Sequence, residues 1–102
     1  MTEQAYEAVE IARTSGTIKK GINEVTKAVE REEAELVVVA SNVSPKEIIM
    51  HIKPLCEEKG ATYVEVEDKE ELGVAAGLPI STSAVVITEP GKAKPQIEAL
   101  KA

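Results

Sequence analysis

A short run of consecutive β-branched residues constrains the fold of this chain more than any other feature. The run is ELVVVAS, residues 35–41. Because its apolar residues follow one another without alternation, both faces of this strand must be covered, as in a sheet with helices on each side. Two further segments, TYVEVE (62–67) and SAVVIT (83–88), are predicted as strands. The sequence therefore predicts a sheet buried between helices.

Amphipathic helices are predicted before and between these strands. Residues 3–13 carry apolar side chains at helical spacing and stop before Gly16. A second helix is predicted over 23–31, with an apolar inner face, and the segment TIKKG between the two helices is predicted as an extended connector. The members of the inner face are Ile22, Val25, Thr26 and Val29.

The segment SPKEIIMHIKPLCEEKG has clear helix signals at both ends. Ser44 as N-cap, Pro45 at the first helical position and Glu47 two residues later form a capping box, and Gly60 ends the helix. Pro54 lies inside, where it removes a backbone donor and is expected to kink or interrupt the helix.

Two short helices complete the pattern, at 68–77 and 94–102. Helices thus alternate with strands along 102 residues, a length that suits one domain. We therefore expect a single domain, 1–102, of the α/β class, with a three-layer α/β/α sandwich around a central mixed sheet.

Composition excludes several classes of function. The net charge of −6 argues against binding nucleic acid through summed charge. Tyr6 and Tyr63 are the only aromatic residues, so no platform exists on which several bases could stack. Any nucleic-acid binding must therefore use a local patch.

Catalytic, metal and membrane roles find no support in the sequence. Cys56 is the only cysteine and His51 the only histidine, so no disulfide or metal-ligand pattern can form, and we expect no catalytic residue, metal or cofactor. No apolar run approaches the ~20 residues of a membrane span, and the N-terminus lacks a signal-peptide pattern. The expected location is the cytoplasm.

The segment GINEVTK, residues 21–27, mixes a glycine with polar side chains at the start of the second helix. At ~100° per residue, one face of this helix carries Lys20, Asn23, Glu24, Lys27 and Arg31. A purely structural explanation accounts for these residues, because exposed helix faces are polar, Asn23 can cap the helix and Glu24 favours its dipole.

A functional explanation is RNA recognition. A helix N-terminus attracts phosphate, and Gly21 lets the phosphate approach the backbone. The carboxylate of Glu24 can accept from two donors on the Watson–Crick edge of guanine. Lys27 can donate to guanine O6 or N7, and Asn23 can both donate and accept. Together they could read a non-Watson–Crick purine pair.

The chain resembles the kink-turn-binding RNA proteins, which include an archaeal large-subunit ribosomal protein of the "L seven Ae" type. The matching segments are IKKGINEVTKAVER, LVVVASNVSP, EIIMHIKPLCEEK, YVEVEDKEELGVAAG and EPGKAK. They cover nearly the whole chain in order. The resemblance implies an α/β/α fold that clamps an RNA internal loop with tandem sheared G·A pairs and an extruded nucleotide.

By this resemblance, Gly21, Asn23, Glu24 and Lys27 contact the G·A pairs and nearby backbone, with Lys20 and Arg31 beside them. A second group borders or covers the extruded nucleotide. It comprises Ser44, Ile48, Lys69, Leu78, Pro79 and Ile80.

The resemblance also implies cellular roles and partners. These are a place in the archaeal large ribosomal subunit and in box C/D and H/ACA guide ribonucleoproteins, with RNase P as a further role. The implied partners are kink-turn RNA, in ribosomal or guide RNA, and the core proteins of the guide ribonucleoproteins, and the protein is expected to be a monomer without RNA.

The sequence departs from the family pattern at several positions. Ile22 stands where a small residue or threonine is usual, and Glu32 where glycine usually ends the helix. Ser41 and Asn42 replace usual acidic residues. An alternative is therefore a protein-interaction module of the same fold without RNA binding, whereas a small hydrolase would need convergent acid and base groups that the sequence lacks.

Overall fold

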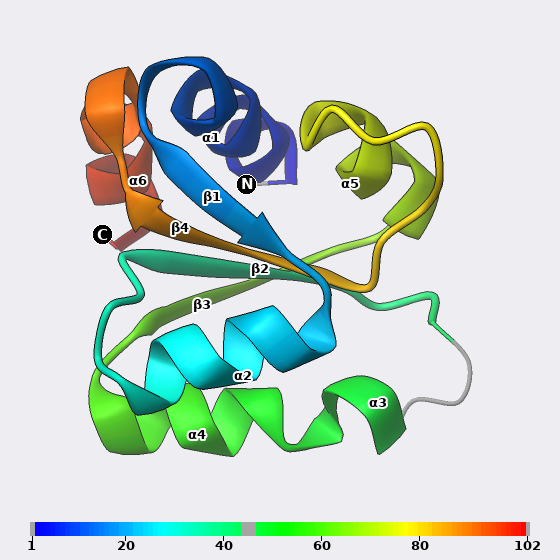
Figure 1. The fold of residues 1–102 in the computed structure, drawn as a ribbon, viewed down its shortest axis with the longest axis vertical. Coiled ribbons are helices and arrows are strands. Elements are labelled where there is room, and N and C mark those ends of the chain that lie inside the picture. Colours follow the sequence, from blue (N-terminus) through cyan, green and yellow to red (C-terminus); the bar gives the residue numbers. More distant parts are fainter. Residues whose placement is uncertain (1, 44–46, 102) are drawn as a thin grey trace.

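The computed structural model describes residues 2–43 and 47–101 of the chain (Figure 1). Its helices and strands alternate along the sequence. In chain order the elements are α1 (Thr2–Ser15), β1 (Thr17–Lys20), α2 (Ile22–Glu30), β2 (Leu36–Ala40), α3 (Glu47–Met50), α4 (Ile52–Lys59), β3 (Thr62–Val66), α5 (Lys69–Ala75), β4 (Ala84–Glu89), the 3₁₀ turn η1 (Gly91–Ala93) and α6 (Lys94–Lys101).

The strands form one mixed sheet in the order β1-β4-β2-β3. β4 runs antiparallel to both of its neighbours, whereas β2 and β3 run parallel. Figure 1 shows α1, α5 and α6 on one face of the sheet and α2, α3 and α4 on the other. The predicted class, a three-layer α/β/α sandwich with a central mixed sheet, is confirmed.

The core lies on both faces of the two central strands. Every residue of β2 is buried, as the uninterrupted apolar run predicted, and Val37 pairs with Val86 of β4 and Tyr63 of β3. Val9 of α1 and Val29 of α2 are fully buried in helices that cover opposite faces. This double covering explains why β2 shows no apolar and polar alternation.

The segment TIKKG is extended as predicted, but it is a strand of the sheet and not a connector. Residues Thr17–Lys20 form β1, an edge strand that pairs antiparallel with β4, with Ile18 opposite Ile87 and Lys20 opposite Val85. Its side chains are mostly exposed, so the local sequence carries little apolar signal. Pairing with a strand near the other end of the chain, rather than local preference, makes this segment a strand.

The predicted interruption of the long helix is confirmed. α3 ends at Met50 and α4 begins at Ile52, with His51 as a turn between them. The reason is Pro54, whose missing N–H leaves the Met50 carbonyl without its normal donor four residues later. Gly60 ends α4 in the left-handed conformation, with φ of 73°. The predicted capping residues Ser44 and Pro45 lie outside the described residues.

The remaining helices match the predictions within a few residues, and one turn was missed. α1 ends before Gly16, α5 begins after Asp68, and α6 holds Pro95 in its first turn. The 3₁₀ turn η1 precedes α6 and was not predicted. Among the described residues, no helix has the length and apolar character that a bilayer crossing requires.

Candidate RNA-binding surface

The first turn of α2 begins at a glycine with an unusual backbone conformation. Gly21 is the N-cap, with φ of 94° and ψ of 150°, a region that residues with a Cβ rarely adopt. Its N–H donates to the carbonyl of Ala84 at 3.0 Å, which fixes this turn to the start of β4. A Cβ placed on Gly21 would meet no atom within 4 Å. The space beside the Cα of Gly21 is therefore open.

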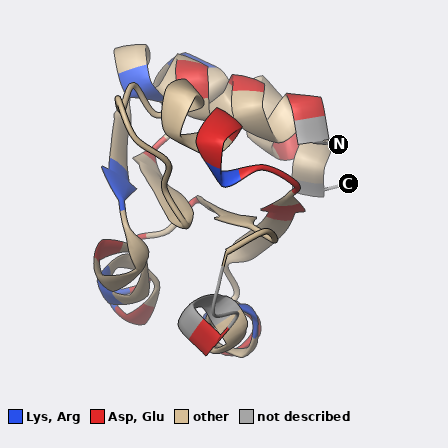
Figure 2. Ribbon diagram, turned by 90° about the vertical axis from the view of Figure 1, so that its right-hand side faces the viewer, with Lys and Arg blue, Asp and Glu red and all other residues tan. Residues whose placement is uncertain are grey.

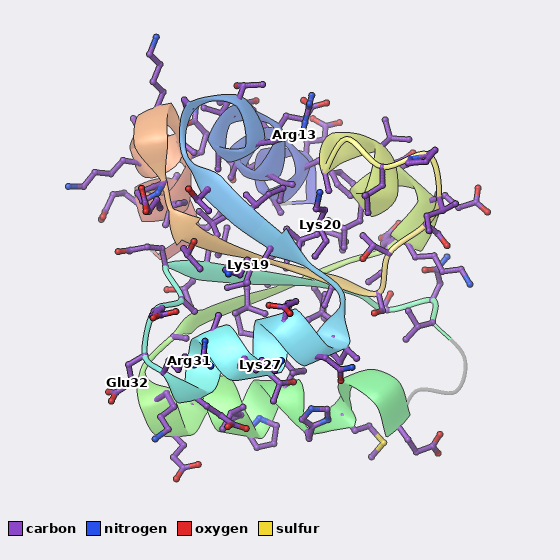
Figure 3. All side chains as sticks on the ribbon, viewed as in Figure 1. Arg13, Lys19, Lys20, Lys27, Arg31 and Glu32 are labelled. Carbon is purple, nitrogen blue, oxygen red and sulfur yellow. The ribbon has the colours of Figure 1, made fainter. Side chains whose placement is uncertain are left out.

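The exposed face of α2 carries the side chains that the sequence singled out. Asn23, Glu24, Lys27 and Arg31 are exposed. The opposite face is apolar, as predicted, because Val25, Ala28 and Val29 are buried. Figure 3 shows Lys27 and Arg31 along the helix. The polar group thus lies on one surface beside the glycine turn that begins α2.

Two details of this group differ from the sequence interpretation. Lys20 belongs to strand β1 and not to a backward extension of the helix, although it is exposed and lies directly before Gly21. Asn23 is not the cap of α2, because Gly21 occupies that position and no side chain caps the turn. The amide of Asn23 is therefore not committed to capping its own helix.

A second part of the surface lies at the start of α5. Asp68 is the N-cap, and its Oδ1 accepts from the N–H of Glu70 at 2.9 Å. The N–H of Lys69 donates to Oδ1 of Asn42, also at 2.9 Å. Asn42, a departure from the family pattern, thus connects the segment after β2 to the first turn of α5.

The loop after α5 folds back over its own helix. A Cβ on Gly73 would lie 2.2 Å from the carbonyl oxygen of Ile80, so only glycine allows this approach. The N–H of Leu78 donates to the Gly73 carbonyl at 2.9 Å and closes the turn. The N–H of Thr82 then donates to the Lys69 carbonyl at 3.2 Å.

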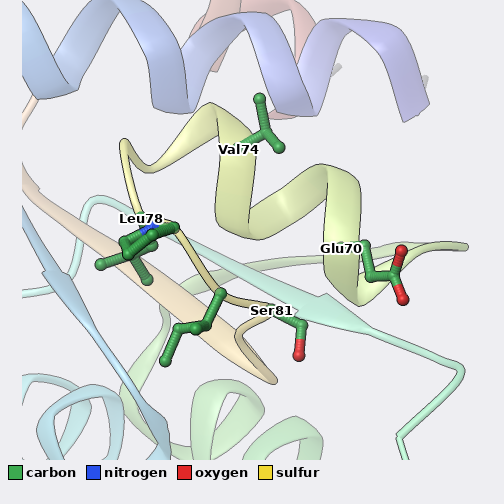
Figure 4. A pocket seen from close by; sticks show the side chains of 6 residues that line it. Glu70, Val74, Leu78 and Ser81 are labelled. Carbon is green, nitrogen blue, oxygen red and sulfur yellow. The ribbon is translucent and has the colours of Figure 1, made fainter.

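This loop forms a hollow of about 460 Å³ with α5 (Figure 4). Its lining is partly apolar, and Val74 and Ile80 are 69% and 70% exposed. Its volume lies in the ~300–1,000 Å³ range of small-molecule pockets. The lining residues are Glu70, Val74, Leu78, Pro79, Ile80 and Ser81.

Strand β4 and the loop before it connect the two parts of the surface. Ala84 accepts from Gly21 of the α2 turn, and Thr82 donates to Lys69 of α5. The structure therefore brings Lys69 and the 78–80 loop to the same end of the sheet as the start of α2. Of the other predicted residues, Ser44 lies outside the described residues, and so does the side chain of Ile48.

Charge on this surface is local and mixed. Figure 2 shows lysine and arginine on β1 and α2, whereas acidic residues outnumber basic ones on α1 and α5. Arg13, which is not among the predicted site residues, lies against Gly77 after the end of α5, since a Cβ on Gly77 would be 2.7 Å from Cδ of Arg13. No local pattern could have indicated this contact.

Cys56 and His51 lie outside this surface and contact other parts of the fold. Cys56 is fully buried, and burial, followed by the charge of Glu57, raises the pKa of its thiol to about 11. Nε2 of His51 lies 3.2 Å from Oγ1 of Thr26, which itself donates to the Ile22 carbonyl. His51 therefore donates to Thr26 and joins α2 to the α3–α4 junction. Within residues 2–43 and 47–101, no cluster of side chains could hold a metal ion.

Comparison with known proteins gives three results. Residues 3–97 match the Ribosomal protein L7Ae/L30e/S12e/Gadd45 family. The large ribosomal subunit protein eL8 of Haloquadratum walsbyi is 48% identical over 102 residues, which are 100% of this chain and 85% of that protein. The structure of the Giardia lamblia 15.5kD RNA binding protein superposes with a TM-score of 0.90 at 31% identity, covering 96% of this chain and 82% of that one.

Proposed function

Because the chain belongs to the ribosomal protein L7Ae/L30e/S12e/Gadd45 family, we propose that it is a non-enzymatic RNA-binding protein of the archaeal large ribosomal subunit that recognises kink-turns. The membership confirms the family resemblance drawn from the sequence. The similar Giardia protein is described as RNA binding, and it shares the fold that carries the surface described above.

The observation that carries this proposal is the glycine turn that begins α2, with open space beside Gly21, next to three exposed polar side chains. Glu24 accepts from N1–H and N2–H of a guanine whose Watson–Crick edge is free in a sheared G·A pair. Lys27, one turn later, donates to the same base, and Asn23 contacts the adenine partner. Gly21 admits the RNA backbone, because no atom occupies the space beside its Cα.

The remaining basic side chains have a positioning role in this proposal. Lys20 on β1 and Arg31 at the C-cap of α2 are exposed on either side of the bases. Phosphate contacts of this kind fix the register of the RNA without reading its sequence. Base contacts and shape, and not summed charge, then explain how a protein with a net charge of −6 binds RNA.

The loop after α5 is proposed to cover the extruded nucleotide. Leu78, Pro79 and Ile80 offer apolar contact to a base, and Lys69 offers a donor or a positive charge at the edge. Ser44 and Ile48 complete this pocket in the proposal. The loop is held against α5 by the close approach at Gly73, so it is shaped before RNA arrives.

The proposed mechanism is selection of a bent RNA. Free RNA of this type samples extended and bent forms, and a protein that contacts only the bent form shifts the population toward it. The chain acts as a single domain, monomeric without RNA, in the cytoplasm. Further proposed roles are the nucleation of box C/D and H/ACA guide ribonucleoproteins, together with their core proteins, and participation in RNase P.

Titration against paired RNAs tests the proposal. One RNA carries a kink-turn, and the other has both G·A pairs replaced by Watson–Crick pairs at physiological salt. Tight binding to the first RNA alone supports the proposed readout. Equal binding to both, or binding to neither, contradicts it and favours the protein-interaction module of the same fold.

A further inference from the structure

One residue beside the proposed RNA-binding surface has a strained backbone. Glu32 follows the C-cap of α2 and has φ of 58°, and no other residue with a Cβ has a positive φ in the described part of the chain. A Cβ in this conformation crowds the neighbouring carbonyl oxygen, and glycine would remove that crowding. Strain retained at one position suggests that its side chain has a use.

The surroundings of Glu32 suggest what that use is. Figure 3 shows Glu32 at the end of α2, next to Arg31 and beyond Lys27. Glu30, Glu32, Glu33 and Glu35 are all exposed, so carboxylates gather around Arg31 where α2 ends. On the proposed function, RNA that extends past Lys27 and Arg31 would therefore meet negative charge at the end of the helix.

This inference rests on the proposed function: we propose that Glu32 is a specificity-determining residue that confines RNA contact to the kinked segment of the RNA. Its carboxylate repels phosphates of any duplex that continues past the end of α2. The bases of a kink-turn still reach Asn23, Glu24 and Lys27 near the start of the helix. Uninterrupted duplex offers phosphates only, so it gains nothing to offset the repulsion.

The expected effect follows from the Coulomb interaction. A carboxylate about 8 Å from one phosphate in water changes a binding constant by about 2- to 3-fold, and a change to the opposite charge roughly squares that factor. The effect should shrink as salt rises, because the screening length falls to about 8 Å at physiological ionic strength.

The test compares Glu32→Gln and Glu32→Lys with the wild type and with Glu10→Gln. Glu10→Gln changes the net charge by the same amount as Glu32→Gln. Glu10 is exposed on α1, across the sheet from α2, so this change lies away from the proposed RNA-binding surface. Each protein is titrated with a kink-turn RNA with short arms, the same RNA with both arms lengthened, and a long duplex with the G·A pairs replaced. All titrations are repeated over a salt series.

At low salt we expect Glu32→Gln to bind the long duplex about 2- to 3-fold more tightly than the wild type, and Glu32→Lys more tightly still, with little change for the short kink-turn RNA. Glu10→Gln should change neither. Equal gains from Glu10→Gln and Glu32→Gln, or no gain from either Glu32 variant, overturn the proposal for Glu32. If the wild type binds the kink-turn RNA and the long duplex with equal affinity, the proposed kink-turn recognition is contradicted. The proposal for Glu32 is still tested in that case, because its effect is measured on the long duplex.

Discussion

Replacing Glu32 by glycine should stabilise the fold. The helix end around Glu32 has the hydrogen bonds of a Schellman motif, with Glu33 N–H donating to the Ala28 carbonyl at 2.9 Å and Glu32 N–H to the Val29 carbonyl at 3.0 Å. The backbone must therefore keep its positive φ whichever residue stands there. The left-handed conformation costs a residue with a Cβ about 1–2 kcal/mol.

Glycine recovers only part of that cost. Glycine also gives the unfolded chain more conformational freedom, which reduces the gain by about 0.4–1 kcal/mol. Glu32→Gly should therefore raise the free energy of unfolding by about 0.5–1 kcal/mol. For a domain of this size, that corresponds to a Tm about 3–6 °C higher. Thermal unfolding followed by circular dichroism, and urea unfolding with an unchanged slope, would measure the difference.

Two control variants separate strain from charge. Glu33→Gly makes the same substitution one residue later, where φ is not positive and no strain is relieved. It should lower stability, because glycine increases the conformational entropy of the unfolded chain. Glu32→Gln removes the charge and keeps the strain, so its Tm should stay near that of the wild type. A Glu32→Gly protein no more stable than Glu32→Gln would refute the reasoning from backbone strain.

Three further predictions follow from the other parts of the structure. Glu24→Ala and Lys27→Ala should each weaken binding to a kink-turn RNA by about 1–3 kcal/mol with unchanged Tm, measured by titration beside the matched variant Glu10→Ala. Gly73→Ala should destabilise the fold by about 3 kcal/mol in urea unfolding, because its Cβ would lie 2.2 Å from the Ile80 carbonyl oxygen; a loss below about 0.5 kcal/mol would mean that the loop moves freely. Burial raises the pKa of Cys56 from 9.0 to about 11, so the folded state keeps a proton that the unfolded chain releases, and stability should fall as pH rises through this interval. Urea unfolding across these pH values should show a smaller decline for Cys56→Ala than for the wild type.

The parts of the fold that a local pattern determines could be predicted from the sequence. The apolar run of β2 requires covering on both faces, and the spacing of Val25 and Val29 defines the inner face of α2 and hence the exposed positions of Glu24 and Lys27. Pro54 indicated an interrupted helix for a covalent reason. The placement of these side chains was therefore correct, while their contacts with RNA remain predictions.

The parts that sequence reasoning missed depend on partners far along the chain. β1 looked like a connector because its strand character comes from pairing with β4. Asn42 looked like a mere departure, although its side chain holds the first turn of α5. Arg13 was not among the predicted site residues, although it lies against Gly77. In each case the partner is specified by tertiary packing and not by spacing.

The bond between Gly21 and Ala84 has a consequence for the order in which the protein is made. The N-terminal half of a chain leaves the ribosome first, and contacts between distant segments must wait for the later segment. The first turn of α2 is held by the start of β4, and β1 has its sheet partner only in that strand. A nascent chain that ends before residue 84 thus displays Lys27 without the contacts that hold the start of α2 in place. On the proposed function, discrimination between RNAs should therefore arise late in synthesis, when the last strand enters the sheet.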